Sequence, residues 1–493
     1  MLSKGHVGII LTAVVLLCAV TPILYFMPAA SVWVALGLGL ATVAYFFVSR
    51  LIGGQQVREQ QPRGWQNLLS LLGIFLFMLL TFAILFANNA SSVMTVVLIT
   101  AIIFTLVVNF LTVPMAVVHR MREDRSILSP LSYYPKVSII VPAYNEEVLL
   151  GRTVENLIEA DYPDKEIIVV DDGSTDRTYE VAMRYQSHGV KAVTRPNGGK
   201  FAALNHGLCF ATGEIVITVD ADSLIARAAI KEIVRGFADP EVAGVAGNLS
   251  VFNRHNLITR LQALEYIVQI QVIRRAFENF GTLTVASGAF SAFRRDAMAE
   301  CGNYDPDRLL EDFDLTIKLL KSRRLLQGSR EALCYTEAPE TIGDVCRQRL
   351  SWYRGDFQNF WKHRDAFFNP RFGFMHRLTF PYMLLSMTLL PFASIIVIAT
   401  SVVMLLNGQG MTLLYAFGLF VIMQFLLSAL AIQIAQEDMK LVIYSPLYIV
   451  GYKHLLDLLM IIALFDIIIG RGQYLKRERV RRIGELRQAE ARQ

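Results

Sequence analysis

Two aspartates, Asp220 and Asp222, follow directly on the apolar run Ile215–Val219. A β-branched run of this kind is typical of a strand buried on both faces of a sheet. Open α/β sheets bind ligands beyond the carboxyl ends of their strands. Paired carboxylates at such a place suit Mg²⁺ or Mn²⁺ held together with a diphosphate. An exposed loop also often carries two acids, so this pair alone leaves both interpretations open.

Two earlier segments have the same form, with polar residues at the end of an apolar run. Val137–Pro142 leads into Ala143-Tyr144-Asn145-Glu146, and Lys165–Val170 leads into Asp171-Asp172-Gly173. Helical patterns after each run give a βαβ rhythm, which predicts a mainly parallel sheet. Asp171 and Asp172 could accept hydrogen bonds from a nucleobase or a ribose. They could equally form a turn and cap the next helix.

Three further places carry residues suited to phosphate or sugar chemistry. The glycine turn Arg195–Gly199 presents Lys200 before a predicted helix, where a lysine can meet a phosphate or remain solvated. Small residues at Ser287 and Gly288 would let the backbone approach a flat ligand. Glu311 and Asp312 open another predicted helix, where acids often only complement the helix dipole.

The composition indicates a membrane protein with a soluble insert. Hydrophobic residues make up 54% of the 493 residues and charged residues only 18%, too apolar for an ordinary soluble protein. The apolar surplus lies in long blocks at both ends, each long enough to cross a bilayer. The predicted spans are residues 7–27, 31–49, 67–88 and 91–118, then 379–405 and 411–434, with an interrupted block at 441–470.

Positive charge predicts the orientation of these spans. Basic residues occur at Lys4, in the loop 50–65 and in the segment 119–125, whereas the other turns between the N-terminal spans carry none. Because positively charged loops remain in the cytoplasm, this distribution places the soluble insert on the cytoplasmic side. The basic tail should also be cytoplasmic, so block 441–470 is predicted to be bent or a hairpin. We expect a multi-pass protein of the plasma (inner) membrane. Five cysteines without a metal spacing fit a reduced compartment, and the net charge of +5 gives no reason to expect a nucleic-acid partner.

The predicted organisation has five parts. Residues 1–125 form a transmembrane block of four helices, and residues 130–345 form the cytoplasmic domain. Amphipathic interface helices occupy 346–376, a second transmembrane block 377–472, and a basic cytoplasmic tail 473–493. Interleaved aromatic and basic residues support the interface assignment of the third part.

Six short motifs follow one another in a fixed order: V-P-A-Y-N-E, V-D-D-G-S, V-D-A-D, S-G-A-x-x-x-F-R-R, L-E-D and finally Gln348-Arg349-Leu350-Ser351-Trp352. This ordered set resembles the membrane-embedded, processive members of glycosyltransferase family 2. These include poly-N-acetylglucosamine, chitin, hyaluronan and cellulose synthases. The resemblance covers residues 130–360 closely and the membrane layout loosely. It implies a nucleotide-sugar-binding GT-A type α/β domain inserted between helical transmembrane bundles.

The resemblance also implies roles for single residues. Asp312 matches the general base and Glu311 is its neighbour, while Asp220 and Asp222 match the metal-binding pair. The other matches fall on the nucleotide-sugar site, at Tyr144, Glu146, Asp171, Asp172, Lys200, Asp220, Ser287 and Gly288, and on the acceptor site, at Gln348, Arg349, Trp352 and Arg354. An aromatic face such as that of Trp352 can stack on a pyranose ring.

One position departs from the family. Ser351 stands where the Q-x-x-R-W motif has arginine, and serine supplies no permanent charge. Arg347 and Arg354 fall on the same helical face by spacing, so either is a candidate to replace that charge. The alternative is an enzyme with shorter products or altered processivity.

The function expected from the resemblance is an inverting, metal-dependent β-glycosyltransferase. It would polymerise a UDP-sugar at the cytoplasmic face and pass the polysaccharide across the membrane, with Mg²⁺ or Mn²⁺ as cofactor. The segments S-G-A-F-S-A-F-R-R and T-E-A-P-E-T most resemble those of poly-N-acetylglucosamine synthases, a resemblance that favours UDP-N-acetylglucosamine as the donor. Membrane lipid and an accessory membrane or export subunit are further expected partners. A glucan or hyaluronan synthase, a non-processive enzyme making a lipid-linked sugar, and a non-catalytic membrane scaffold are the alternatives.

Overall fold

The structure, a computed structural model, describes residues 133–306, 310–367, 369–408 and 410–470, with Thr112, Met115, Ala116, His119 and Leu131 in addition. Apart from Thr112, Met115 and Ala116, the four predicted N-terminal spans lie outside the described residues, as does the basic tail. The chain divides into two compact units, which are described separately. One unit comprises residues 116–388 and 455–493, and the other comprises residues 1–115 and 389–454.

The first unit is built on an eight-stranded mixed sheet with the order β3-β2-β1-β4-β7-β6-β8-β5. The strands are β1 (Val137–Ala143), β2 (Lys165–Asp171), β3 (Lys191–Thr194), β4 (Ile215–Val219), β5 (Leu224–Ile225), β6 (Val242–Val251), β7 (Phe290–Arg294) and β8 (Leu325–Thr336). Strands β3, β2, β1 and β4 are parallel to one another. β7 is antiparallel to both of its neighbours, and β6 and β8 are again parallel. The predicted α/β class with a mostly parallel sheet is therefore confirmed.

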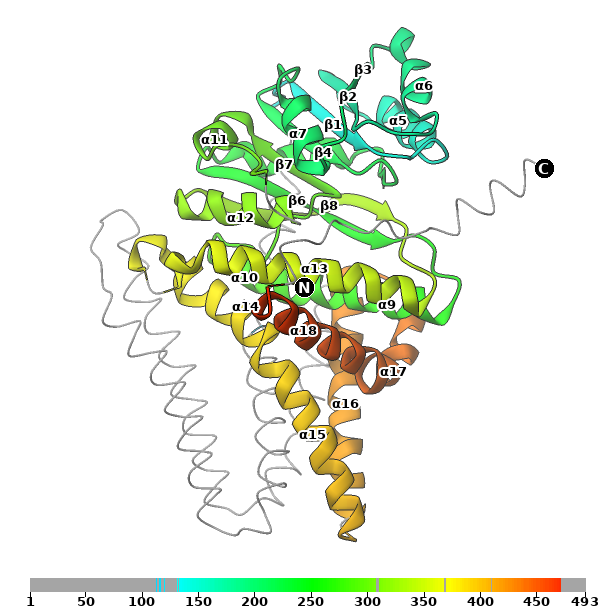
Figure 1. The fold of residues 1–493 in the computed structure, drawn as a ribbon, viewed down its shortest axis with the longest axis vertical. Coiled ribbons are helices and arrows are strands. Elements are labelled where there is room, and N and C mark those ends of the chain that lie inside the picture. Colours follow the sequence, from blue (N-terminus) through cyan, green and yellow to red (C-terminus); the bar gives the residue numbers. More distant parts are fainter. Residues whose placement is uncertain are drawn as a thin grey trace, which may run out of the picture. The chain divides into compact units, whose positions relative to one another are not determined.

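Helices cover both faces of this sheet (Figure 1). One apolar core joins the sheet to α5 (Leu150–Glu159), α6 (Thr178–Met183) and α8 (Ala229–Arg235). The other joins it to α7 (Lys200–Leu208), α11 (Arg295–Glu300), α12 (Glu311–Lys321) and α13 (Ile342–Lys362). All five residues of β4 are buried, as expected for a strand between two helical layers. In this three-layer arrangement the carboxyl ends of the parallel strands β1, β2, β3 and β4 lie at the same edge of the sheet.

Close backbone approach is needed where α7 crosses β1. A Cβ added to Gly207 would lie 2.5 Å from the Ile140 Cγ2 atom, so glycine lets the helix pack directly on the strand. Gly199, which precedes α7, has a φ of +90°, a left-handed value that glycine adopts without strain. These two glycines fix where α7 begins and how closely it packs.

Residues 257–278 form one helical run with a change of pitch. α9 (Leu257–Val268) begins with a capping box between Asn256 and Thr259. It continues through the π-helical segment η4 (Gln269–Arg274) into α10 (Arg275–Glu278). Short 3-10 segments are η2 (Gln186–His188), η3 (Gly236–Ala238), η5 (Arg364–Ala366) and η6 (Pro370–Phe372). The π-helical segment η7 (Met375–Thr379) leads into α14 (Phe380–Met387).

The C-terminal apolar blocks are helical. The elements are α15 (Leu389–Leu406), α16 (Gly410–Ala435), η8 (Met439–Tyr444), α17 (Ser445–Leu447), η9 (Tyr448–Tyr452) and α18 (Lys453–Ile468). Within the described part of the chain, the helical stretches 375–406 and 439–468 are long and apolar enough to cross a membrane. The block that hydropathy marks as irregular, 441–470, contains the π-helical segment η9.

Candidate active site

The loops that follow β1 and β2 are joined by hydrogen bonds. Asn145 has a φ of +54°, and its backbone N–H donates to Ser174 Oγ at 2.9 Å. Its side-chain oxygen accepts from the Thr175 N–H at 2.8 Å. The Glu146 N–H donates to Thr178 Oγ1 at 2.7 Å. These contacts present Tyr144, which is 42% exposed, at the edge where parallel strands of an α/β sheet bind ligands.

Asp171 and Asp172 are both buried, and both organise this edge. Asp171 accepts from the Ser174 N–H at 3.2 Å and from Thr194 Oγ1 at 2.8 Å. Asp172 accepts from the Gly199 N–H at 2.7 Å and pairs with the Arg195 Nη1 atom at 2.8 Å. Asp171 therefore has the turn-forming role that the sequence left open, whereas Asp172 holds the separate turn 195–199. Arg195, which sequence reasoning did not select, holds the turn before Lys200.

Lys200 is the centre of a charged cluster. Its Nζ atom lies 2.5 Å from Asp220 Oδ1 and 3.3 Å from Glu311 Oε1. The side chain of Lys200 is 17% exposed, that of Asp220 25% and that of Glu311 4%. The ends of β4, α7 and α12 thus meet at one ammonium group. The structure brings together here three residues that the sequence placed in three separate motifs.

Asp312 is fixed beside this cluster by backbone donors. Its Oδ2 atom accepts from the Gly288 N–H at 2.7 Å, and its Oδ1 atom accepts from the Phe313 N–H at 2.8 Å. A Cβ added to Gly288 would lie 3.2 Å from Asp312 Oδ2, so the absence of a side chain permits this approach. Ser287 forms the same turn, since its backbone oxygen accepts from Ser291 Oγ at 2.7 Å. The carboxylate is therefore held in one orientation.

A second carboxyl in this region has a different character. Asp356 lies on α13, and burial raises its pKa well above the ordinary value, with the negative charge of Asp312 adding to the effect. Burial disfavours the charged form of such a group.

The chemistry of Asp220 and Asp222 fits a divalent cation only in part. Both supply hard carboxylate oxygens, and a lysine cation already contacts Asp220. In the described ranges, no group of three or more His, Cys, Asp or Glu side chains could hold a metal. Asp222 accepts from Ser223 Oγ at 3.1 Å and lines a small cavity with Arg152 and Tyr335. A metal held by this pair would need further oxygens, which a diphosphate provides.

The predicted acceptor segment lies in the first half of α13. Arg349 is fully buried, and its guanidinium donates to both carboxylate oxygens of Glu265 on α9, at 2.8 and 3.2 Å. The same group lies 4.2 Å from the centroid of the Trp352 ring, a cation–π contact. It also donates to Gln348 Oε1 at 2.5 Å. Arg349 thus orients the two neighbours, Gln348 and Trp352, for which the sequence predicts sugar contacts.

The two arginines that could replace the charge missing at Ser351 are both paired. Arg347 contacts Asp344 one turn earlier on α13. Arg354 contacts Asp466 on α18, with Nη2 and Oδ2 2.5 Å apart. In this structure each positive charge is balanced by a carboxylate of the protein.

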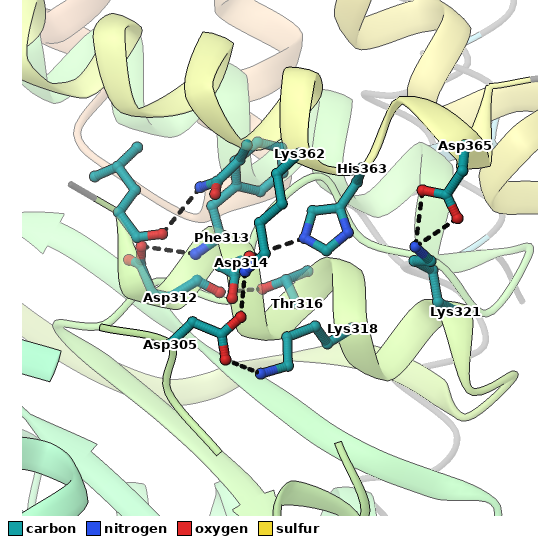
Figure 2. A network of polar contacts seen from close by, with 12 residues as sticks. Asp305, Asp312, Phe313, Asp314, Thr316, Lys318, Lys321, Lys362, His363 and Asp365 are labelled. Carbon is teal, nitrogen blue, oxygen red and sulfur yellow. Dashed lines mark hydrogen bonds and ion pairs between the residues drawn. The ribbon is translucent and has the colours of Figure 1, made fainter. Parts of the chain in front are cut away.

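The second half of α13 forms a polar network with α12 that sequence reasoning missed (Figure 2). His363 Nε2 lies 2.8 Å from Asp314 Oδ1, and Lys362 Nζ lies 2.5 Å from the same atom. Lys362 also contacts Asp305, which Lys318 pairs at 2.7 Å. His363 and Asp314 are buried. Their separation of 49 residues left no sequence signal for the contact.

Residues 138–302 match the family model described as glycosyl transferase family 2. The chain carries a family 2 glycosyltransferase domain. The matched residues run from β1 to the end of α11 and include Asp171, Lys200, Asp220 and Gly288.

Curated relatives of this chain are named poly-beta-1,6-N-acetyl-D-glucosamine synthase. The protein of Staphylococcus epidermidis is 32% identical over 232 residues, which are 46% of this chain and 56% of the relative. That of Staphylococcus aureus strain COL is 29% identical over 222 residues, 44% and 54% of the two chains. The match thus spans about half the length of each curated relative.

A solved structure shares the fold of the domain. A mannosyltransferase from Pyrobaculum calidifontis, in complex with GDP-Man and Mn2+, gives a TM-score of 0.54 with 22% identity. The similarity covers 77% of this chain and 99% of that one. It confirms the GT-A-like α/β fold predicted from the motifs.

Proposed function

We propose that this chain is an inverting, metal-dependent, processive β-glycosyltransferase of a polysaccharide-synthesising type. It transfers sugar from a UDP-sugar, with UDP-N-acetylglucosamine as the favoured donor, to a growing chain at the cytoplasmic face of the membrane. The multi-pass helices then conduct the polymer outward. One observation carries the proposal: Lys200, Asp220 and Glu311 converge on one charge cluster, and a backbone amide orients Asp312 beside it.

Each residue of the cluster has a chemical task in that reaction. Asp312 accepts the proton of the attacking acceptor hydroxyl. Lys200 neutralises charge on the departing diphosphate. Asp220 and Asp222 would hold a divalent ion, which would stabilise the same negative charge as a Lewis acid. No second carboxylate needs to act as a nucleophile, so the configuration at the sugar is inverted. Trp352 and Gln348 hold the acceptor sugar.

The names of the curated relatives support N-acetylglucosamine as the sugar. The apolar helical stretches 375–406 and 439–468 support attachment to the membrane. The buried side chains of Asp171 and Asp172 support a donor site built from the loops after β1 and β2.

The decisive test uses the full chain purified in detergent with Mn²⁺. Each of several radiolabelled UDP-sugars is supplied separately, and the product is sized and digested with linkage-specific hydrolases. We expect a long polymer from UDP-N-acetylglucosamine alone. The variant Asp312→Asn should lower transfer by about 10²- to 10⁴-fold, the range for loss of a general base, while UDP binding is retained. Failure of every UDP-sugar to yield a polymer would refute the proposal.

A non-processive transferase making a lipid-linked sugar is the second candidate. The observation that favours it is the pairing of Arg347 with Asp344 and of Arg354 with Asp466, because no uncompensated charge then replaces the one absent at Ser351. Radiolabel confined to a lipid-extractable product would select this alternative.

A further inference from the structure

The two halves of helix α13 contact different helices of the unit that contains the sheet. Arg349, in the first half, is anchored to Glu265 of α9. The second half contacts the beginning of α12 at two points. Asn359, which is fully buried, donates from Nδ2 to the Leu310 carbonyl oxygen at 3.0 Å. His363 and Lys362 contact Asp314.

These two points lie on either side of Glu311 and Asp312. Leu310 is the residue before the pair, and Asp314 is the second residue after Asp312. An edge-to-face contact between Phe313 and Phe360, with ring centroids 5.7 Å apart, packs the helices between the polar contacts. Helix α13 therefore holds the first turn of α12 from both sides of the proposed base.

The contacts are buried and electrically balanced. Burial lowers the pKa of His363 and outweighs the opposing effect of Asp314. Burial opposes ionisation of Asp314, but hydrogen bonds from His363 and Lys362 outweigh it and lower the pKa of that carboxyl. A neutral imidazole donating to Asp314 Oδ1, with Lys362 as counter-charge on the same oxygen, stabilises a buried carboxylate without excess charge. Figure 2 shows these groups converging on Asp314 from α13.

We propose that Asn359, Lys362 and His363 are positioning residues that fix the distance between the acceptor sugar and the Asp312 carboxylate. This inference rests on the proposed function. Trp352 lies seven residues before Asn359, about 10 Å along a continuous helix at 1.5 Å per residue. Helix α13 carries both the proposed acceptor residues and the contacts to α12. A displacement of its C-terminal end therefore changes the distance between the acceptor hydroxyl and the Asp312 carboxylate. None of the three residues touches the reacting atoms.

The test compares variants that remove each contact with variants that keep it. His363→Phe and Asn359→Leu remove a donor and retain bulk, whereas His363→Gln and Lys362→Arg retain a donor. Lys321→Met is the matched control, because Lys321 joins α12 to Asp365 after α13 through an exposed pair at 2.8 Å (Figure 2).

Two readouts separate positioning from folding in the full-length protein. Sugar transfer in His363→Phe and Asn359→Leu should fall about 10- to 100-fold, as for a displacement near 1 Å, with UDP affinity within about twofold of wild type. Hydrolysis of the UDP-sugar by water should persist. The donor-retaining variants and the control should transfer at nearly the wild-type rate.

Amide hydrogen exchange gives the second readout, which does not depend on activity. Exchange at the first turn of α12 should accelerate at least about threefold in the contact-removing variants and stay unchanged in Lys321→Met. Unchanged exchange would overturn the inference, as would a parallel loss of UDP binding and transfer. If the wild type makes no polymer but the exchange pattern holds, the proposed function fails while the contact between helices stands.

Discussion

Replacing Lys200 with methionine should increase the affinity of the donor-free protein for Mn²⁺. In the structure the Lys200 ammonium lies 2.5 Å from Asp220 Oδ1. A positively charged side chain of the protein is thus already paired with one of the two predicted metal ligands. A metal ion must break that contact before Asp220 can bind it. Charge-assisted hydrogen bonds contribute about 1.5–3 kcal/mol. Both side chains keep some exposure, so we take about 1–2 kcal/mol, which corresponds to about a 5- to 30-fold change in affinity.

The assay is a titration of the purified full chain with Mn²⁺, following free ion by electron paramagnetic resonance without donor present. Lys200→Met should bind Mn²⁺ more tightly and UDP more weakly than wild type, because the diphosphate loses its cation. Lys200→Arg retains a charge and should resemble wild type, as should Lys191→Met, which removes an exposed pair with Glu166. Unchanged or weaker Mn²⁺ binding in Lys200→Met would refute the reasoning.

Three further outcomes follow from the same structure. Gly288→Ala should lower sugar transfer about tenfold at unchanged unfolding temperature, because the methyl group would lie 3.2 Å from the base carboxylate; full activity would contradict this. Arg349→Leu should destabilise the detergent-solubilised protein by about 3–5 kcal/mol, because it removes the guanidinium that pairs with the buried Glu265. Arg347→Leu, which removes a half-exposed arginine, should cost less than about 1 kcal/mol. Equal losses of stability in thermal unfolding would contradict this prediction. Burial lowers the pKa of His363 from 6.5, so the unfolded chain binds the proton more readily than the folded chain. The free energy of unfolding should therefore decline as the pH falls below 6.5. In His363→Gln this decline should be shallower.

The parallel half of the sheet could be predicted from sequence because its strands are continuous apolar runs. β1, β2 and β4 are buried on both faces, so their sequences differ sharply from their surroundings. β3 and β8 were not predicted. β3 has four residues, none of them buried, and β8 mixes buried and partly exposed positions over twelve. Without a regular alternation, such strands have no clear period.

The site shows a similar division between local and long-range information. Motif order identified Lys200, Asp220 and Asp312 as members of one site, although the distances between them could come only from the fold. The sequence did not single out Asn359, in α13, or His363, directly after it, because an amide and an imidazole form no distinctive pattern in a segment rich in aromatic and basic residues. Their partners, Leu310 and Asp314, are 49 residues away in sequence.

The antiparallel strand β7 has a consequence for how this domain can be recombined. It separates the sheet into a group β3-β2-β1-β4, encoded by residues 137–219, and a group containing β6 and β8, encoded by residues 242–336. The residues proposed for nucleotide recognition, apart from the turn at Ser287 and Gly288, belong to the first stretch or follow it at once. Those proposed for the base and the acceptor come later in the chain. A chimaera joined between α8 and β6 would therefore exchange the proposed donor residues, except Ser287 and Gly288, as one contiguous segment and leave the proposed base and acceptor residues in place.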